Sequence, residues 1–226
     1  MLKRNLVNYV KNKDLIEKNI GPLQVIVKDK VQGQVDIEAS FNVVVRVLPN
    51  YFLNLVDVVY IGQFDFLNER DVNAMFVDGS LFVTNIQDDD ADLVDDLVHE
   101  IAHAVEDAYS QFIYEDGKIE QEFLLKRSKL RSVLKNQSYD IDHLNFLEVE
   151  YNENLDRYFY EEIGYDILEQ LTVNIFTNPY AATSLREYFA TGFEEYYLGK
   201  KLYLKQLCPY VYSKVFVLNE NINEEI

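Results

Sequence analysis

Two of the three histidines in this chain lie in the sequence His99-Glu100-Ile101-Ala102-His103. Side chains four residues apart in an α-helix lie on one face, so both imidazoles can bind one cation from the same side. Glu100 follows the first histidine, where its carboxylate can reach a water molecule held by that cation. Random placement would give H-E-x-x-H in roughly 0.3 % of chains of this composition. The pattern predicts a zinc site, and the alternative is a structural helix whose histidines are satisfied by hydrogen bonds.

The residues around this motif predict the helix that would carry it. Asp88 to Asp90 precede the motif and can cap a helix N-terminus. Apolar residues then recur at helical spacing and would bury one face: Ala91, Val94, Leu97, Val98, Ile101, Ala102 and Val105. Both histidines fall beside this apolar stripe. Glu106 and Asp107 follow one turn later, where they could fix an imidazole tautomer or could be ordinary solvated side chains.

A catalytic zinc usually has three protein ligands and one water, so a third ligand must come from elsewhere in the chain. The short-spacer pattern HExxHxxGxxH is absent, because position 106 is Glu and position 109 is Tyr. The best candidate is Glu187, within the apolar first turn of a predicted helix over 184–199, because a buried carboxylate needs a partner. The alternatives are His143 and other carboxylates: Glu161, Glu162, Glu194 and Glu195.

These motifs resemble those of the anthrax lethal factor-like zinc metallopeptidases, a gluzincin group that includes the clostridial Pro-Pro endopeptidases. Members carry HExxH on one helix and a zinc-binding Glu on a later one, in a motif similar to Glu-Phe-Phe-Ala-Glu-x-Phe. Here the second motif reads Glu187-Tyr188-Phe189-Ala190-Thr191-Gly192-Phe193. The resemblance covers residues 56–216, and its specific motifs are confined to 99–107 and 180–212.

The resemblance implies a zinc-dependent endopeptidase that binds one Zn²⁺ per chain through His99, His103 and Glu187. Glu100 would be the general base toward the water held by the ion, and would later pass the proton to the leaving amine. The lethal factor branch has a tyrosine near the metal, seven residues before the ligand Glu, and Tyr180 stands at that position here. Tyr180 would donate a hydrogen bond to the developing oxyanion. The alternative for Tyr180 is a packed aromatic side chain at the end of a loop.

Thr191-Gly192 departs from the family pattern, which often has an acidic residue followed by a small one. The site would then lack a supporting carboxylate, unless Glu106 or Asp107 replaces it, and Gly192 lowers the helix propensity. This departure favours the second hypothesis, a catalytically inactive zincin-fold protein that binds a partner. Glu100 argues against that hypothesis, because a general base serves catalysis. A structural zinc site is disfavoured, because such sites prefer four ligands, often cysteines, and this chain has one cysteine.

The composition limits the remaining classes of function. A net charge of −18 argues against nucleic-acid binding and could attract a basic peptide, and the favoured alternative is that it serves solubility alone. We therefore expect a peptide or protein substrate, no nucleic acid and, without an apolar run of 18 residues, no membrane span. The N-terminus has no continuous apolar segment typical of a signal peptide, so we expect a cytoplasmic location, or a mature secreted form. Cys208 is the one cysteine in the sequence, so an internal disulfide is ruled out.

The periodicities predict an α+β, zincin-like fold with a small mixed sheet, an exposed edge strand, the HExxH helix and a helical C-terminal part. Strands are expected over 23–27, 56–64, 74–77 and 81–84, the last two as a hairpin around Asp78-Gly79. Helices are expected over 1–20, 36–48 (with a strand as the alternative), 117–135, 150–173 with a break at Gly164, 184–199 and 201–218 with a break at Pro209. The tail 219–226 is expected to be frayed.

The length suits a single metallopeptidase domain over residues 1–226. We expect the sheet and the HExxH helix in 22–110, and the third-ligand helix and the C-terminal helix in 179–226. Residues 111–178 would be a helical insert, either a lid over the site or a bundle behind it. Residues 82–85 are predicted to form the exposed sheet edge, where an extended substrate could add as a further strand, or to be an ordinary edge strand.

Overall fold

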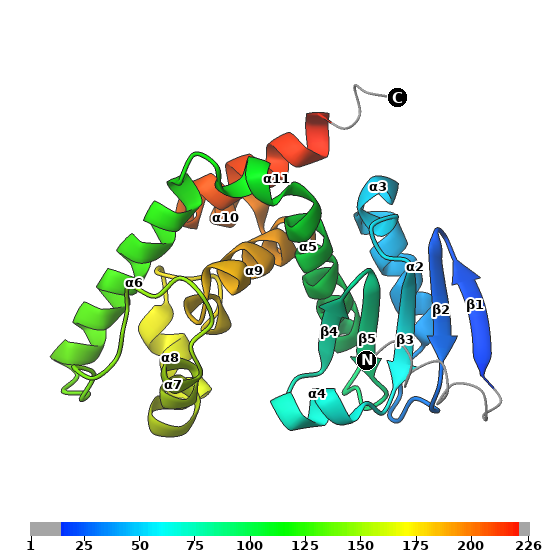
Figure 1. Cartoon of the computed structure of the whole chain (residues 1–226), viewed down its shortest axis with the longest axis horizontal. Helices are drawn as coiled ribbons and strands as arrows, with labels where there is room; N and C mark the ends of the chain where they lie inside the picture. Colours follow the sequence, from blue (N-terminus) through cyan, green and yellow to red (C-terminus); the bar gives the residue numbers. More distant parts are fainter. Residues whose placement is uncertain (1–14, 222–226) are drawn as a thin grey trace. The chain divides into compact units, whose positions relative to one another are not determined.

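The computed structural model describes residues 15–221 (Figure 1). Its contacts divide the chain into two compact units, one up to Val105 and the other from Glu106 onward. The division falls within the long helix α5 (Asp90–Tyr114), which therefore contributes to both units. The single domain expected from the length stays a prediction.

The first unit is built on one mixed sheet with the strand order β1-β2-β3-β5-β4 within the described residues (Figure 1). The strands are β1 (Ile16–Ile20), β2 (Leu23–Val27), β3 (Val58–Gly62), β4 (Ala74–Val77) and β5 (Ser80–Thr84). The central strands β2, β3 and β5 run parallel, and the outer strands β1 and β4 pair antiparallel with their neighbours. The mixed sheet and the helices that follow it confirm the α+β class.

The prediction that residues 82–85 form the exposed edge is wrong. β5 lies between β3 and β4, and β4 is the edge strand on that side of the sheet. The physical reason is the hydrophobic pattern of the hairpin. Leu81, Phe82 and Val83 are all buried, which suits an interior strand covered on both faces, whereas only Ala74 is buried in β4.

The helix predicted over residues 1–20 is also wrong for the described part, because residues 16–20 form strand β1; residues 1–14 lie outside the described residues. β1 forms a hairpin with β2, in which Ile20 pairs with Leu23 across Gly21 and Pro22. Gly21 has φ +58°, as the first turn residue of a type II′ hairpin requires, and proline fits the second. Pairing with β2 therefore outweighs the helical spacing of the apolar residues.

The other predicted helices are confirmed, whereas the two short helices over 50–53 and 65–70 have no counterpart in the prediction. The first unit contains α2 (Ile37–Val47), α3 (Asn50–Leu53), α4 (Asp65–Arg70) and the start of α5. The second unit contains the end of α5, α6 (Lys118–Asn136), α7 (Glu153–Arg157), the π-helical turn η1 (Tyr158–Ile163), α8 (Tyr165–Thr172), the 3₁₀ turn η2 (Tyr180–Ala182), α9 (Leu185–Tyr197), α10 (Lys201–Leu207) and α11 (Pro209–Asn221). The expected fraying of the tail is wrong for 219–221, which continue α11, and residues 222–226 lie outside the described residues. No helix within residues 15–221 is both long and apolar enough to span a membrane.

Aromatic packing holds the helices of the second unit around α9. The rings of Phe123, Phe176 and Tyr188 are mutual neighbours with centroids 5.5 to 6.3 Å apart. One helical turn after Tyr188, a Cβ added to Gly192 would lie 2.5 Å from a methyl group of Val211. Glycine at this position therefore allows α11 to pack closely against α9. This contact gives Gly192 a structural reason, although it departs from the motif of the family that the sequence resembles.

The hairpin that presents the edge strand β4 generates a first prediction. Asp78 and Gly79 both have positive φ, as a type I′ turn requires, and a Cβ on Gly79 would lie 2.6 Å from a carboxylate oxygen of Asp57. We expect Gly79→Ala to lower the free energy of unfolding by about 2 kcal/mol, because strain and a clash add. Gly117→Ala is the matched control, since Gly117 has φ +66° but only a side-chain atom of Gln121 at 3.9 Å. Equal urea midpoints for the two variants would contradict this account of the turn.

Candidate metal centre

Helix α5 presents the two histidines as the sequence predicts. The Asp89 carboxylate accepts hydrogen bonds from the main-chain N–H groups of Ala91 (2.8 Å) and Asp92 (3.0 Å), and so caps the helix. The apolar stripe behind the motif is buried at Leu97, Val98, Ile101, Ala102 and Val105, whereas Ala91 at its start is exposed. The imidazole rings of His99 and His103 lie 5.1 Å apart, with His99 half-buried and His103 buried. One face of a buried, capped helix therefore carries both rings.

Helix α9 holds Glu187 in its first turn. Ser184 caps the helix, and its hydroxyl accepts a hydrogen bond from the main-chain N–H of Glu187 at 3.2 Å. Both chain neighbours of Glu187 are also bound. The Arg186 guanidinium contacts two carboxylates of α5, and the Tyr188 hydroxyl donates to Glu122 of α6 at 2.7 Å. These contacts fix the backbone on each side of Glu187, so its side chain starts from a well-defined position.

The partners of Arg186 are the two acidic residues that follow the second histidine. Its Nε donates to Glu106 and its Nη2 to Asp107, each at 3.0 Å. Glu106 is buried and also accepts a hydrogen bond from the Tyr114 hydroxyl at 2.5 Å. Burial and the nearby Glu106 carboxylate raise the pKa of Tyr114, so this hydroxyl remains a donor. The predicted contact of Glu106 or Asp107 with an imidazole stays a prediction.

The Arg186–Glu106 ion pair bears directly on where Glu187 can lie. Glu106 is three residues beyond His103 on α5, and such residues are neighbours on a helix surface. Because Arg186 binds Glu106, the first turn of α9 is held against the part of α5 that begins the second unit. Glu106 and Arg186 are 80 residues apart in the sequence, so the spacing of the motifs does not reveal this ion pair.

Three of the predicted metal ligands come together. His99, His103 and Glu187 each offer one ligand atom, and these atoms all lie within 4.8 Å of one another. Within residues 15–221 this is the one group of three or more His, Cys, Asp or Glu side chains with that proximity. Two imidazole nitrogens and a carboxylate oxygen are the donor set of many catalytic zinc ions, and three ligands leave a position for water. The residues present therefore fit zinc chemically.

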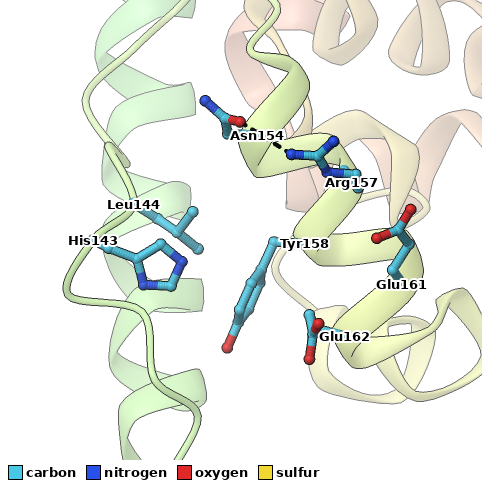
Figure 2. Close-up of a pocket in the computed structure, with 7 residues that line it drawn as sticks. All are labelled: His143, Leu144, Asn154, Arg157, Tyr158, Glu161 and Glu162. Atoms are coloured by element: carbon cyan, nitrogen blue, oxygen red, sulfur yellow. Dashed lines mark hydrogen bonds between the residues drawn. The ribbon is translucent and has the colours of Figure 1, made fainter.

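The alternative third ligands do not join this group. His143, Glu161 and Glu162 surround a separate pocket of about 280 Å³ in the second unit. Figure 2 shows the His143 ring beside Tyr158, with their centroids 5.6 Å apart, and the two glutamates on the turn beyond. All three side chains are exposed. Glu195 instead accepts a hydrogen bond from the main-chain N–H of Lys200 at the end of α9.

Glu100 has a contact that the sequence does not reveal. Its side chain is buried, and its Oε2 accepts a hydrogen bond of 2.6 Å from the main-chain N–H of Phe76 in strand β4. The carboxylate thus ties α5 to the edge of the sheet. The argument that an inactive scaffold has no need of Glu100 is therefore wrong, because this residue also has a structural role. Which main-chain N–H lies near Glu100 depends on how β4 pairs in the sheet. The HExxH motif alone does not contain this information.

The structure places the remaining site residues as follows. Tyr180 begins the turn η2, which packs on α9, and it is half-buried; its role as a hydrogen-bond donor stays a prediction. Thr191 is buried, and its hydroxyl bonds to that of Thr177 at 3.1 Å. The residue that replaces the acidic position of the family motif is therefore part of the packing inside the second unit.

Sequence reasoning missed Asp96, one turn before His99. Burial raises the pKa of its carboxyl group from 3.8 to about 7, and the negative charges of Asp92 and Glu100 act in the same direction. A hydrogen bond from the Gln87 amide at 3.1 Å opposes this increase. Six aspartates lie between residues 88 and 96, and this pattern does not indicate which of them is buried.

Comparisons with known proteins add no relationship. No protein-family model matches the chain, and no curated protein or solved structure is significantly similar to it.

The raised pKa of Asp96 predicts how stability depends on pH in the metal-free protein. The folded state binds the proton more tightly than the unfolded state, so stabilisation by protonation is present below pH 4 and lost as the pH rises to about 7. We expect Asp96→Asn to be more stable than the wild type at pH 8, by on the order of 1 kcal/mol, and equal to it near pH 4.

Urea unfolding at several pH values measures this difference. Asp95→Asn is the matched control, because Asp95 is exposed and carries the same charge one residue earlier. A stability difference between Asp96→Asn and the wild type that stays constant from pH 4 to pH 8 would contradict the burial of an ionised Asp96.

Proposed function

We propose that this protein is a zinc-dependent endopeptidase of the zincin-like, gluzincin type, similar to the anthrax lethal factor-like peptidases. The observation that carries the proposal is the proximity of the ligand atoms of His99, His103 and Glu187, within 4.8 Å of one another. An HExxH motif on a capped helix and a glutamate in the first turn of a later helix support it.

Each residue has a defined task in this proposal. His99, His103 and Glu187 would hold one Zn²⁺. The bound ion would lower the pKa of a water molecule and polarise the scissile carbonyl group. Glu100 would accept the proton of the attacking water and deliver it to the leaving amine. Tyr180 would donate a hydrogen bond to the oxygen on which negative charge develops.

The substrate would be a peptide or protein segment in extended conformation. β4 is an edge strand, and its outer main-chain groups, apart from the N–H of Phe76 that binds Glu100, can pair with an added strand. The proposal therefore transfers the substrate edge from 82–85 to β4. The acidic stretch of residues 88–96 at the start of α5 favours basic residues in the substrate. A net charge of −18 disfavours nucleic acid as a partner.

A second candidate function is a zincin-fold protein that binds its partner without hydrolysis. One specific observation favours it, since the hydrogen bond from Phe76 gives Glu100 a structural role that an inactive protein would also keep. Thr191 in place of an acidic residue points the same way. Hydrolysis by the zinc-loaded protein separates the two functions.

Glu100→Gln tests the proposed base. Glutamine retains an oxygen that can accept the hydrogen bond from Phe76 but cannot take up a proton at neutral pH. We expect peptide cleavage to fall about 10³-fold while the zinc content and melting temperature stay those of the wild type. The substrate is a random decapeptide library, and mass spectrometry of new termini measures cleavage.

Each result has a distinct meaning. Cleavage by Glu100→Gln at the wild-type rate would show that Glu100 is not the base. A wild type that holds one zinc per chain and leaves the library intact would favour the binding protein. Glu100→Ala, which also loses the bond to Phe76, serves as the control for the structural role and is expected to melt at a lower temperature.

A further inference from the structure

Strand β4 directs the main-chain N–H of Phe76 away from β5, its hydrogen-bonded partner strand. The main-chain oxygen of Asn73 accepts a hydrogen bond from the N–H of Thr84 at 2.7 Å. In an antiparallel pair the bonded positions alternate, so Met75 and Val77 direct their main-chain groups toward β5. The N–H of Phe76 therefore lies on the free edge of the sheet.

This N–H donates a short hydrogen bond of 2.6 Å to the carboxylate of Glu100. The bond joins Oε2 of Glu100, so the other carboxylate oxygen, Oε1, has no part in it. An exposed edge N–H would normally face water or invite another strand to pair. Here a buried side chain from α5 covers it, and both atoms belong to the same compact unit.

We propose that the main-chain N–H of Phe76 is a positioning group for Glu100: it fixes Oε2 to the edge of the sheet and so orients the carboxylate for the proton transfer. This role rests on the proposed peptidase function, because Glu100 needs an orientation only if it acts as a base. The residue acts through Glu100 and does not touch the substrate. Catalysis is sensitive to such positioning, because a carboxylate about 1 Å out of place can lose about 100-fold in rate.

The hydrogen bond itself is testable without any activity. We expect amide hydrogen exchange of Phe76, measured by NMR, to be slow in the wild type and in Glu100→Gln, which keeps an acceptor. In Glu100→Ala the Phe76 amide should exchange roughly 10-fold faster or more, because its protecting group is gone. The amides of Met75 and Val77 are internal controls, since they face β5 and should keep their rates. An unchanged Phe76 rate in Glu100→Ala would overturn the proposal.

The positioning role is tested by Phe76→Pro, which removes the N–H, beside Phe76→Ala, which keeps it. Proline is tolerated on an edge strand where the missing N–H faces away from the partner strand, so the β4–β5 ladder can remain. We expect kcat of Phe76→Pro to lie at least about 10-fold below that of Phe76→Ala, with KM values within about 2-fold and equal zinc content. Equal kcat values for the two variants would overturn the positioning role.

The hydrogen-exchange and kinetic experiments together distinguish a failure of this inference from a failure of the proposed function. If the zinc-loaded wild type cleaves no peptide, the peptidase proposal fails and the positioning role with it, while the exchange measurement still decides whether the bond exists. If the wild type cleaves peptides and Phe76→Pro cleaves as well as Phe76→Ala, the peptidase proposal stands and only the positioning role is lost.

Discussion

A carboxylate that leaves water needs hydrogen-bond donors or a cation, and the candidate site depends on this requirement. The buried Glu100 carboxylate accepts a hydrogen bond from the N–H of Phe76. The buried Glu106 carboxylate accepts hydrogen bonds from the Arg186 guanidinium and the Tyr114 hydroxyl. Asp96 has the Gln87 amide, and its pKa nevertheless rises to about 7. The bonds from Phe76 and Arg186 each join α5 to another element. The acidic side chains around the HExxH motif therefore determine what packs against that helix.

Two of these bonds, from Phe76 to Glu100 and from Arg186 to Glu106, connect α5 to different parts of the candidate site. The bond from Phe76 connects the motif to the edge strand of the sheet, on which an extended peptide could pair. The ion pair from Arg186 connects the following turn to the start of α9, next to Glu187. Both bonds are thus made by side chains of α5, in the part of that helix that precedes its kink at Tyr109: one holds the proposed base, and the other holds Arg186, the neighbour of the proposed ligand Glu187. Such support from outside the ligand set is typical of metal sites that hold their geometry.

Much of this could be predicted from local patterns. The HExxH helix, its aspartate cap, the Asp78-Gly79 hairpin and the position of Glu187 in a helical first turn all follow from spacing and turn chemistry, which act over a few residues. The partner of Glu100, the burial of Asp96 and the edge position of β4 could not be predicted, because each depends on how whole elements pack or pair. β1 shows the same limit, since its pairing with β2 outweighs its own helical pattern.

The central claim is that Glu187 completes a zinc site with the two histidines. Elemental analysis of purified wild type beside Glu187→Ala, after zinc loading and removal of excess metal, tests it most directly. His143→Ala is the matched control, because His143 is exposed in a separate pocket. The account predicts one zinc per chain in the wild type and in His143→Ala, and little or none in Glu187→Ala. Full zinc content in Glu187→Ala, or none in the reloaded wild type, would contradict the account.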